Sequence, residues 1–238
     1  LAILGYNVLV IDCDPQAHLS SALHFQEDNK MSTLHDVIIG GLDIKSAIQN
    51  VCEGLDAIPG NLSLTRIEVP LSQKIRREEK IAEAISSIKD RYDFIIFDTN
   101  PTISTLNMNA LVAADQINVV CETQPFSLQG LGILVEELEK FFAEMQLPLN
   151  YKIIANKYES KTATAQEVLG ALRSDYKDVV MQSVVRKSED INIASKLKMP
   201  VSSFAKRSSP AYEDIIDLVT EIKNLSINTL FNTKEKSA

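Results

Sequence analysis

The chain has 238 residues, a formal net charge of −8 and an apolar content of 45%. This length predicts one domain, and the apolar content is sufficient for a hydrophobic core. No apolar run reaches the roughly 18 residues that a membrane span requires. The apolar stretch at the start has no basic front, which argues against a signal peptide. Three widely spaced cysteines fit neither a disulfide framework nor a metal-binding cluster.

The first informative segment is an apolar run that ends in two acidic residues. Residues 8–16 read Val-Leu-Val-Ile-Asp-Cys-Asp-Pro-Gln, and Pro15 ends a strand that we predict over residues 7–13. Alternate side chains of a strand share a face, so Asp12 and Asp14 point the same way from its carboxyl end. Open α/β sheets bind ligands at this end. The pair indicates a metal ion or a base as its partner, and the alternative is two solvated acids.

Short elements and one long helix are expected next. The short elements are helices over residues 19–23, 33–39 and 44–51 and a strand over residues 55–58. Asp43 is a good N-cap for the third of these helices. Isoleucines recur on one side of residues 73–91, which predicts a long amphipathic helix there.

A second apolar strand also ends in an acid. Residues 92–98 read Tyr-Asp-Phe-Ile-Ile-Phe-Asp and precede Thr99, Asn100 and Pro101. This is the form of a Walker B strand, whose terminal Asp helps to hold Mg²⁺ beside nucleotide phosphates. Many buried strands end in Asp, so this strand alone is a weak signal, but the two acidic strands reinforce each other.

The remainder of the chain alternates between helices and strands. We predict helices over residues 105–113, 127–145, 164–176, 189–198 and 209–225, and strands over residues 116–121, 151–155 and 179–185. This alternation predicts an α/β fold with a mostly parallel, doubly wound sheet and helices on both faces.

Together, these segments resemble the deviant Walker family of P-loop ATPases, the MinD/ParA superfamily, and within it the ParA-type partition ATPases. The similarity covers nearly the whole chain and includes residues 109–115, 122–130, 153–157 and 185–190. It implies a P-loop NTPase fold and a single ATPase domain over residues 1–231. The polar residues 232–238 are expected to form a disordered tail.

The phosphate-binding loop of that family is missing from the sequence. No K-G-G-x-G-K-[ST] or G-x-x-x-x-G-K-[ST] segment occurs, and residues 1–5 resemble the end of the helix that follows this loop. We expect that a strand and the loop are cut off; a genuinely loopless relative that cannot hydrolyse ATP is the alternative. The absent strand is expected between the two acidic strands, and residues 1–238 alone are not expected to fold stably.

The resemblance assigns roles to the acidic strands. It implies that Asp14 is catalytic and orients the water that attacks the γ-phosphate of ATP. Asp98 would hold Mg²⁺, and Asp12 would lie beside the same metal and fix the loop after its strand. Thr99 begins a switch that senses the γ-phosphate. The sequence departs from the family's D-T-P-P because Asn100 takes the first Pro position, which leaves the rigidity of the switch open.

Two further segments are implied to contact the nucleotide. Asn156 would read the adenine base, since an amide can both donate and accept hydrogen bonds; an Asx turn is the alternative. Pro125, with its two neighbours, would line the adenine pocket and the dimer face.

A basic region suggests a DNA surface. Residues 152–207 contain 11 Lys or Arg and 6 Asp or Glu, and a basic face on an acidic protein is a plausible DNA footprint; an ordinary solvated surface is the alternative. The candidates are Arg186, Lys187, Lys196, Lys198, Lys206 and Arg207. Arg186 matches a basic position after a strand in the family. Contacts to phosphates would be independent of sequence and sensitive to salt.

The resemblance implies an ATP-dependent homodimer that binds DNA non-specifically on the nucleoid, in the cytoplasm. With a ParB-type centromere-binding partner, it would move a plasmid or a chromosome origin. One alternative is a non-hydrolysing regulatory adaptor of a partition or replication complex. Another is a MinD-like positioning ATPase. Membrane attachment by the last helix would need a basic polar face, but that face carries Glu213, Asp214, Asp217 and Glu221.

Overall fold

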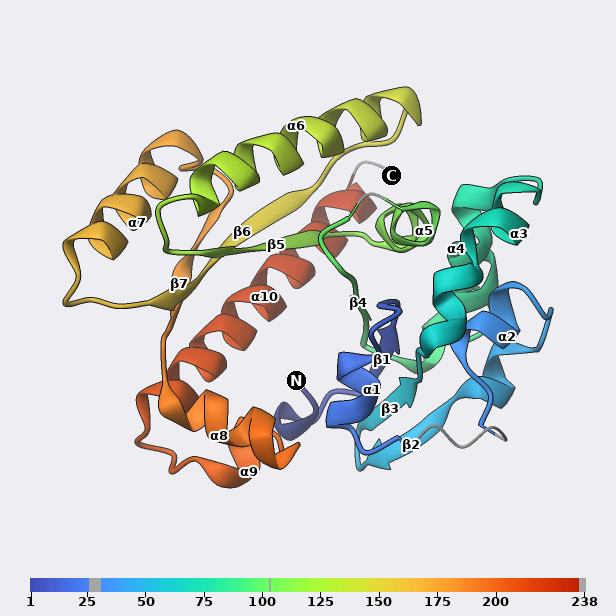
Figure 1. The fold of residues 1–238 in the computed structure, drawn as a ribbon, viewed down its shortest axis with the longest axis horizontal. Coiled ribbons are helices and arrows are strands. Elements are labelled where there is room, and N and C mark those ends of the chain that lie inside the picture. The colour runs from blue at the N-terminus through green and yellow to red at the C-terminus, as the bar shows by residue number, and fades with distance from the viewer. Residues whose placement is uncertain (26–30, 103, 236–238) are drawn as a thin grey trace. The chain divides into compact units, whose positions relative to one another are not determined.

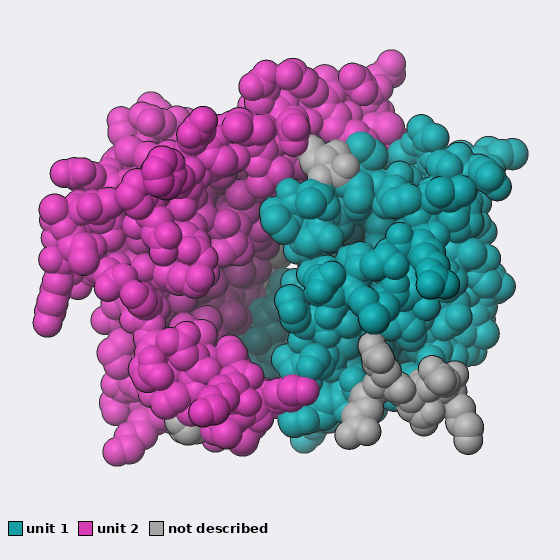
Figure 2. All heavy atoms as spheres, in the orientation of Figure 1, with its two compact units in different colours: residues 1–114 teal, residues 115–238 magenta. Residues whose placement is uncertain are grey.

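The computed structural model describes residues 1–25, 31–102 and 104–235. The chain divides into two compact units, residues 1–114 and residues 115–238, coloured separately in Figure 2. Each unit contains a sheet whose strands are mostly parallel and packed with helices. The predicted fold class is confirmed.

The sheet of the first unit has the strand order β2-β3-β1-β4. Its strands are β1 (Val8–Asp12), β2 (Gln49–Cys52), β3 (Leu55–Ile58) and β4 (Phe94–Asp98). Strand β1 is parallel to both β3 and β4, whereas β2 is antiparallel to β3. Leu9 and Ile11 of β1 are fully buried in a core that includes Ile81 and Leu106.

Short helices surround this sheet (Figure 1). The α-helices are α1 (His18–Ala22), α2 (Leu34–Ile38), α3 (Glu68–Ser72), α4 (Lys80–Ile85) and α5 (Thr105–Ala113). The 3₁₀ turns are η1 (Ala2–Leu4), η2 (Ile44–Ala47), η3 (Leu62–Arg66), η4 (Arg77–Glu79) and η5 (Lys89–Arg91).

The sequence analysis expected a further strand between the two acidic strands, and this expectation is wrong. Strands β1 and β4 are direct neighbours in continuous parallel register, from Val8 opposite Phe94 to Asp12 opposite Asp98. No strand fits between two strands that are hydrogen-bonded to each other along their length. A strand that joined this sheet beside β4 would have to use the edge of β4 that faces away from β1.

Two helix predictions are also corrected. The helix expected over residues 44–51 is only the turn η2, and the following residues form β2 because they pair with β3. The long helix expected over residues 73–91 is broken into α4 and flanking 3₁₀ turns. Arg76 adopts a left-handed φ of 53°, and Ile75 is 86% exposed rather than part of the apolar face.

The sheet of the second unit has the order β5-β6-β7, with both pairs parallel. Its strands are β5 (Ile117–Glu122), β6 (Tyr151–Tyr158) and β7 (Val180–Arg186). The helices are α6 (Ser127–Glu144), α7 (Ala163–Asp175), α8 (Glu189–Leu197), α9 (Val201–Phe204) and α10 (Pro210–Glu235). The sequence interpretation missed α9. Helix α10 extends beyond the predicted residue 225, and residues 236–238 of the expected tail lie outside the described part.

The second unit has its own apolar cluster. Ile154 of β6 packs with Met181 and Val185 of β7, and residues of α8 and α10 close this cluster. Within the described ranges, no helix has the length and apolar character that crossing a membrane demands.

Candidate active site

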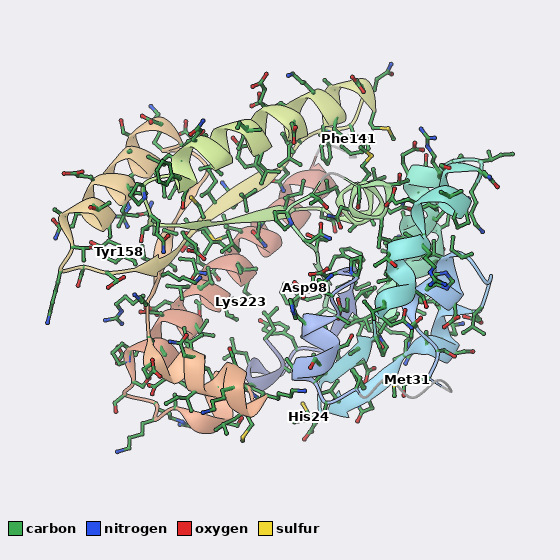
Figure 3. The ribbon with its side chains drawn as sticks, viewed as in Figure 1. His24, Met31, Asp98, Phe141, Tyr158 and Lys223 are labelled. Carbon is green, nitrogen blue, oxygen red and sulfur yellow. The ribbon has the colours of Figure 1, made fainter. Side chains whose placement is uncertain are left out.

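The two acidic strands bring their carboxyl ends together, as their sequences predict. Asp12 lies opposite Asp98 in the parallel register. The backbone N–H of Cys13 donates to the carbonyl oxygen of Asp98 at 2.8 Å, which fixes the two chain segments just where they leave the sheet. Figure 3 labels Asp98, which lies at the end of β4.

Asp12 is a buried carboxylate whose two oxygens both accept hydrogen bonds. Asp12 is only 1% exposed. Oδ2 accepts from the backbone N–H of Ser20 at 2.8 Å and from the Ser20 hydroxyl at 2.6 Å. Oδ1 accepts from the backbone N–H of Asp14 at 3.1 Å. These bonds fit the expected role of fixing the loop after β1.

Ser20 extends this network to the segment that follows β3. Its hydroxyl accepts a hydrogen bond from the backbone N–H of Gly60 at 2.9 Å. A Cβ atom on Gly60 would lie 2.7 Å from the carbonyl oxygen of Asp12 and 3.1 Å from its Cγ. Gly60 is therefore needed for this close approach. Nothing in the sequence pattern gave Gly60 or Ser20 a role.

Asp14 is placed beside this network on a tight turn. Its Oδ1 accepts from the backbone N–H of Gln16 at 2.9 Å, and its carbonyl oxygen accepts from the N–H of Ala17 at 2.9 Å. The residue is half-buried. Because its own N–H is held by Asp12, the position of Asp14 depends on the buried carboxylate.

Asp98 lies in a negative environment. Burial raises the pKa of its carboxyl group, and the charges of Asp12 and Asp14 raise it further, against a smaller opposing effect of His18. A neighbouring cation would relieve this repulsion. Burial is also the main cause of the raised pKa of the Cys13 thiol, and the charges of Asp12 and Asp98 raise it further.

The carboxylates by themselves do not form a complete metal site. Among the described residues, no three His, Cys, Asp or Glu side chains are arranged to hold a metal ion. Mg²⁺ in nucleotide sites is commonly bound by only one or two carboxylates, with water and substrate phosphates as the other ligands. The carboxylate of Asp98 fits that kind of site, whereas Asp12 already accepts hydrogen bonds from three donors and has less acceptor capacity left for a metal ion.

The loop after Asp98 is held by side-chain amides. Asn107 of α5 donates from Nδ2 to the carbonyl oxygen of Asn100 at 2.9 Å and to its Oδ1 at 2.7 Å. It also donates to the carbonyl oxygen of Thr102 at 2.5 Å. The Oδ1 of Asn100 accepts from the backbone N–H of Thr102 at 3.1 Å. Thr99, the expected start of the switch, is exposed. Nothing in the sequence pattern pointed to Asn107.

The expected adenine-binding residues lie in the second unit. The Oδ1 of Asn156 accepts from the backbone N–H of Lys157 at 2.9 Å. Lys157 has a left-handed φ of 53°, and its ammonium group forms an ion pair with Glu122. Pro125 is exposed in the segment between β5 and α6. The local bond of Asn156 joins it to the next residue, so it differs from the Asx turn considered above.

The basic candidates fall into two groups. Arg186 makes a forked ion pair with Asp214 of α10, with Nη2 at 2.6 Å from Oδ1 and Nε at 2.9 Å from Oδ2. Asp214 is 7% exposed and also accepts from the backbone N–H of Arg186 at 2.8 Å. Lys187 pairs with Glu159 at 2.9 Å. The other four candidates are exposed: Lys196, Lys198, Lys206 and Arg207.

Comparisons with known proteins agree with this architecture. A family model described as an AAA domain matches residues 1–153. The chain is 30% identical over 224 residues to the cell division protein PomZ of Myxococcus xanthus, covering 93% of this chain and 70% of PomZ. It is 28% identical over 205 residues to the chromosome partitioning protein ParA of Caulobacter vibrioides, covering 84% of this chain and 77% of that protein.

Solved structures share the fold. A putative plasmid partition protein from Borrelia burgdorferi, bound to AMPPNP, superposes with a TM-score of 0.75 at 22% identity, over 92% of this chain and 89% of that chain. The cobyrinic acid a,c-diamide synthase of Mycobacterium smegmatis, with bound ADP and magnesium, gives a TM-score of 0.72 at 24% identity, over 82% and 80%. The family model, the two curated relatives and the paired acidic strands lead to one conclusion: this chain belongs to the ParA-type family of partition ATPases.

Proposed function

We propose that this protein is a partition ATPase that binds DNA non-specifically as an ATP-bound homodimer. With a ParB-type centromere-binding partner, it would move a plasmid or a chromosome origin across the nucleoid, in the cytoplasm. The observation that carries the proposal is the register that puts Asp12 opposite Asp98. It gathers the acidic residues at the carboxyl edge of the sheet, where α/β folds bind ligands.

Each acid has a separate role in this proposal. Asp98 would hold Mg²⁺, which would neutralise charge on the β- and γ-phosphates of ATP when bound. Asp14 would accept a hydrogen bond from the attacking water and orient it, since phosphoryl transfer depends mainly on positioning and charge stabilisation. Asp12 would lie beside the same metal ion and fix the position of Asp14 through its bond to the N–H of that residue. Thr99 would begin the segment that responds to the γ-phosphate.

The remaining candidate residues belong to the second unit. Asn156 and Pro125 would contact the adenine base. The exposed Lys196, Lys198, Lys206 and Arg207 are the first candidates for DNA phosphates. Lys187 and Arg186 remain candidates, but each would have to share its charge with an acidic partner that is already bound.

DNA retention at several salt concentrations tests the proposal. The protein as it is made in the cell, called the full chain below, is titrated onto a non-specific duplex with ATP and Mg²⁺, with ADP, or without nucleotide. We expect ATP-dependent retention that falls steeply with salt, since each neutralised phosphate contributes about −0.9 to the slope of log K against log salt. Changing Lys196, Lys198, Lys206 and Arg207 to Glu should abolish it.

The matched control changes four basic residues of the first unit to Glu: Lys45, Arg66, Lys74 and Lys89. It produces the same change in net charge but leaves the four proposed DNA contacts intact. We therefore expect it to retain more DNA than the first variant. Equal loss in both variants would assign the effect to net charge alone. Retention of the wild type that did not depend on ATP would contradict the proposed cycle, and retention on anionic liposomes instead of DNA would favour a MinD-like role.

A further inference from the structure

Asn107 is a buried amide that connects helix α5 to the loop after Asp98. The residue is 3% exposed, and its Nδ2 is surrounded by three oxygens, two from Asn100 and one from Thr102. Both loop residues lie within four positions of Asp98 in the sequence. Asn107 therefore donates hydrogen bonds to the segment that the proposed function assigns to γ-phosphate sensing. The acceptors are backbone and side-chain oxygens of that segment.

The other end of the same amide has no partner. The Oδ1 of Asn107 is buried and accepts no hydrogen bond from any described residue. Reversing the amide would not solve this problem, because the oxygen would then face the three loop oxygens. Buried acceptors without a partner are uncommon in folded proteins and call for an explanation.

The helix that carries Asn107 is firmly anchored. The hydroxyl of Ser104 accepts from the backbone N–H of Asn107 at 3.2 Å. The carboxylate of Glu68 accepts from the N–H of Thr105 at 3.1 Å and from the N–H of Leu106 at 3.4 Å. With the start of the helix fixed by these bonds, the loop is the movable partner of the Asn107 amide.

We propose that Asn107 is a positioning residue that sets the place of residues 99–102 beside Asp98, and that its amide exchanges partners when this loop responds to nucleotide. In the arrangement seen, Nδ2 holds the loop oxygens and Oδ1 is left unsatisfied. In the triphosphate-bound arrangement, Oδ1 accepts a backbone N–H from the loop as the oxygens of Asn100 and Thr102 move away. The proposal rests on the proposed ATPase function, and Asn107 itself does not touch the nucleotide.

The neighbouring amide Asn109 provides a matched control. It is also buried, in the same helix, and donates to the carbonyl oxygens of Arg77 at 2.6 Å and Thr105 at 2.8 Å. Its Oδ1 accepts from the backbone N–H of Ile81 at 3.2 Å. Asn109 thus bonds to η4 and α4 and has no bond to the loop among the described residues. Its substitution therefore shows what the loss of a purely structural amide does.

The test compares Asn107→Leu, Asn107→Asp and Asn109→Leu in the full chain. The first readout is the ratio of the dissociation constants for ADP and for a non-hydrolysable ATP analogue. For Asn107→Leu and Asn107→Asp we expect this ratio to change at least tenfold, with affinity for ADP within about twofold of the wild type, since two to three hydrogen bonds of the loop are lost. Asn109→Leu should lower the melting temperature and leave the ratio unchanged.

The second readout does not need nucleotide. Amide hydrogen exchange of Thr99, Asn100 and Thr102 should become faster in both Asn107 variants and stay unchanged in Asn109→Leu. Unchanged exchange and an unchanged ratio in the Asn107 variants would overturn the positioning role, and so would an equal change in Asn109→Leu. Asn107→Asp keeps the size of the side chain while it replaces the NH₂ donor with a carboxylate oxygen, so it serves if Asn107→Leu does not fold. A wild type that binds nucleotide without hydrolysing it would refute the ATPase proposal alone.

Discussion

Asp12 and Asp98 occupy equivalent positions on adjacent strands, but their surroundings give them different chemistry. Three donors satisfy Asp12 inside the fold, whereas Asp98 is exposed at the edge and repelled by its acidic neighbours. The spacing of the acids and the apolar runs before them were sufficient to predict where both lie. The partners Ser20, Gly60 and Asn107 were not predictable, because their contacts arise from how separate segments pack and leave no pattern in the sequence.

The raised pKa of Asp98 predicts a stability that falls with rising pH. The folded state holds this proton above the ordinary pKa of 3.8, so in the window just above that value it binds more protons than the unfolded state. The free energy of unfolding should therefore decrease as the pH rises through the raised pKa. Asp98→Asn should remove this part of the slope and be more stable than the wild type at neutral pH.

Urea unfolding of both proteins between about pH 4 and pH 7 checks this prediction. Parallel stability curves for the wild type and Asp98→Asn would show that the repulsion around Asp98 has no effect on the fold.

Loss of the Ser20 hydroxyl should destabilise the protein. Ser20→Ala removes one donor to the buried carboxylate of Asp12 and the acceptor for the N–H of Gly60. We expect a loss of about 1–3 kcal/mol in the free energy of unfolding, since a buried polar group loses its partner. The half-buried neighbour Ser21 supplies the control, and Ser21→Ala should cost clearly less in the same urea titration. Equal losses in the two variants would contradict the network.

At the scale of elements, the acidic face of α10 covers the edge of a sheet. Glu221 accepts from the backbone N–H groups of Gln182 and Ser183 of β7, both at 2.8 Å, and Asp214 accepts from Arg186 of the same strand. An uncovered edge strand invites pairing with other chains. The sequence predicted both elements and the charges, but it could not show that these acids face a strand.

Contacts between distant elements also explain why the helix expected over residues 73–91 is broken. Isoleucine spacing predicted one helix, but the chain turns at Arg76, and the Asn109 side chain binds backbone groups of η4 and α4. A tertiary contact from a distant helix therefore overrides the local periodicity. Likewise, pairing with β3 turns the expected helical residues after η2 into a strand.

Removing the Glu221 carboxylate should expose the edge of β7. For Glu221→Ala we expect a loss of about 1–3 kcal/mol in stability and faster amide hydrogen exchange at Gln182 and Ser183. Glu213, also on α10, has a largely exposed side chain, so Glu213→Ala should change neither exchange rate. Unchanged exchange at the two amides in Glu221→Ala would rule out the capping of this edge.

Charge reversal at Arg186 should affect the fold as well as any DNA contact. Arg186→Glu places a carboxylate against the buried Asp214 and removes a forked ion pair, so we expect a clear loss of stability. The double variant Arg186→Glu with Asp214→Arg should recover part of it in urea unfolding. A single variant as stable as the wild type would show that the pair does not anchor α10 to β7.

At the scale of the whole molecule, each unit presents an apolar strand at the edge of its own sheet. Ile96 of β4 is 42% exposed and Val120 of β5 is 58% exposed, although parallel strands are normally covered on both faces. The sequence correctly predicted an α/β fold with mostly parallel strands. The expectation of a further strand between β1 and β4 was wrong because strand order depends on pairing across the sheet, which composition and periodicity do not encode.

We still expect that residues 1–238 alone do not fold stably, but the reason is now the exposed edge strands. The weakness lies at the open edges of β4 and β5 rather than between β1 and β4. Purified residues 1–238 alone should unfold without a sharp transition, or associate through these edges, when followed by circular dichroism and light scattering, so the urea titrations above use the full chain. A single cooperative melting transition of a monomer would refute this prediction.

The central claim is that Asp14 orients the water that attacks ATP while other groups bind the nucleotide. The most direct measurement is ATP turnover by the full-chain Asp14→Ala variant, with ATP affinity determined on the same samples and the exposed Gln16→Ala as a control from the same loop. The account predicts that turnover falls by at least about 100-fold, that ATP affinity stays within a few-fold of the wild type, and that the control remains active. Turnover at the wild-type rate in Asp14→Ala would contradict it.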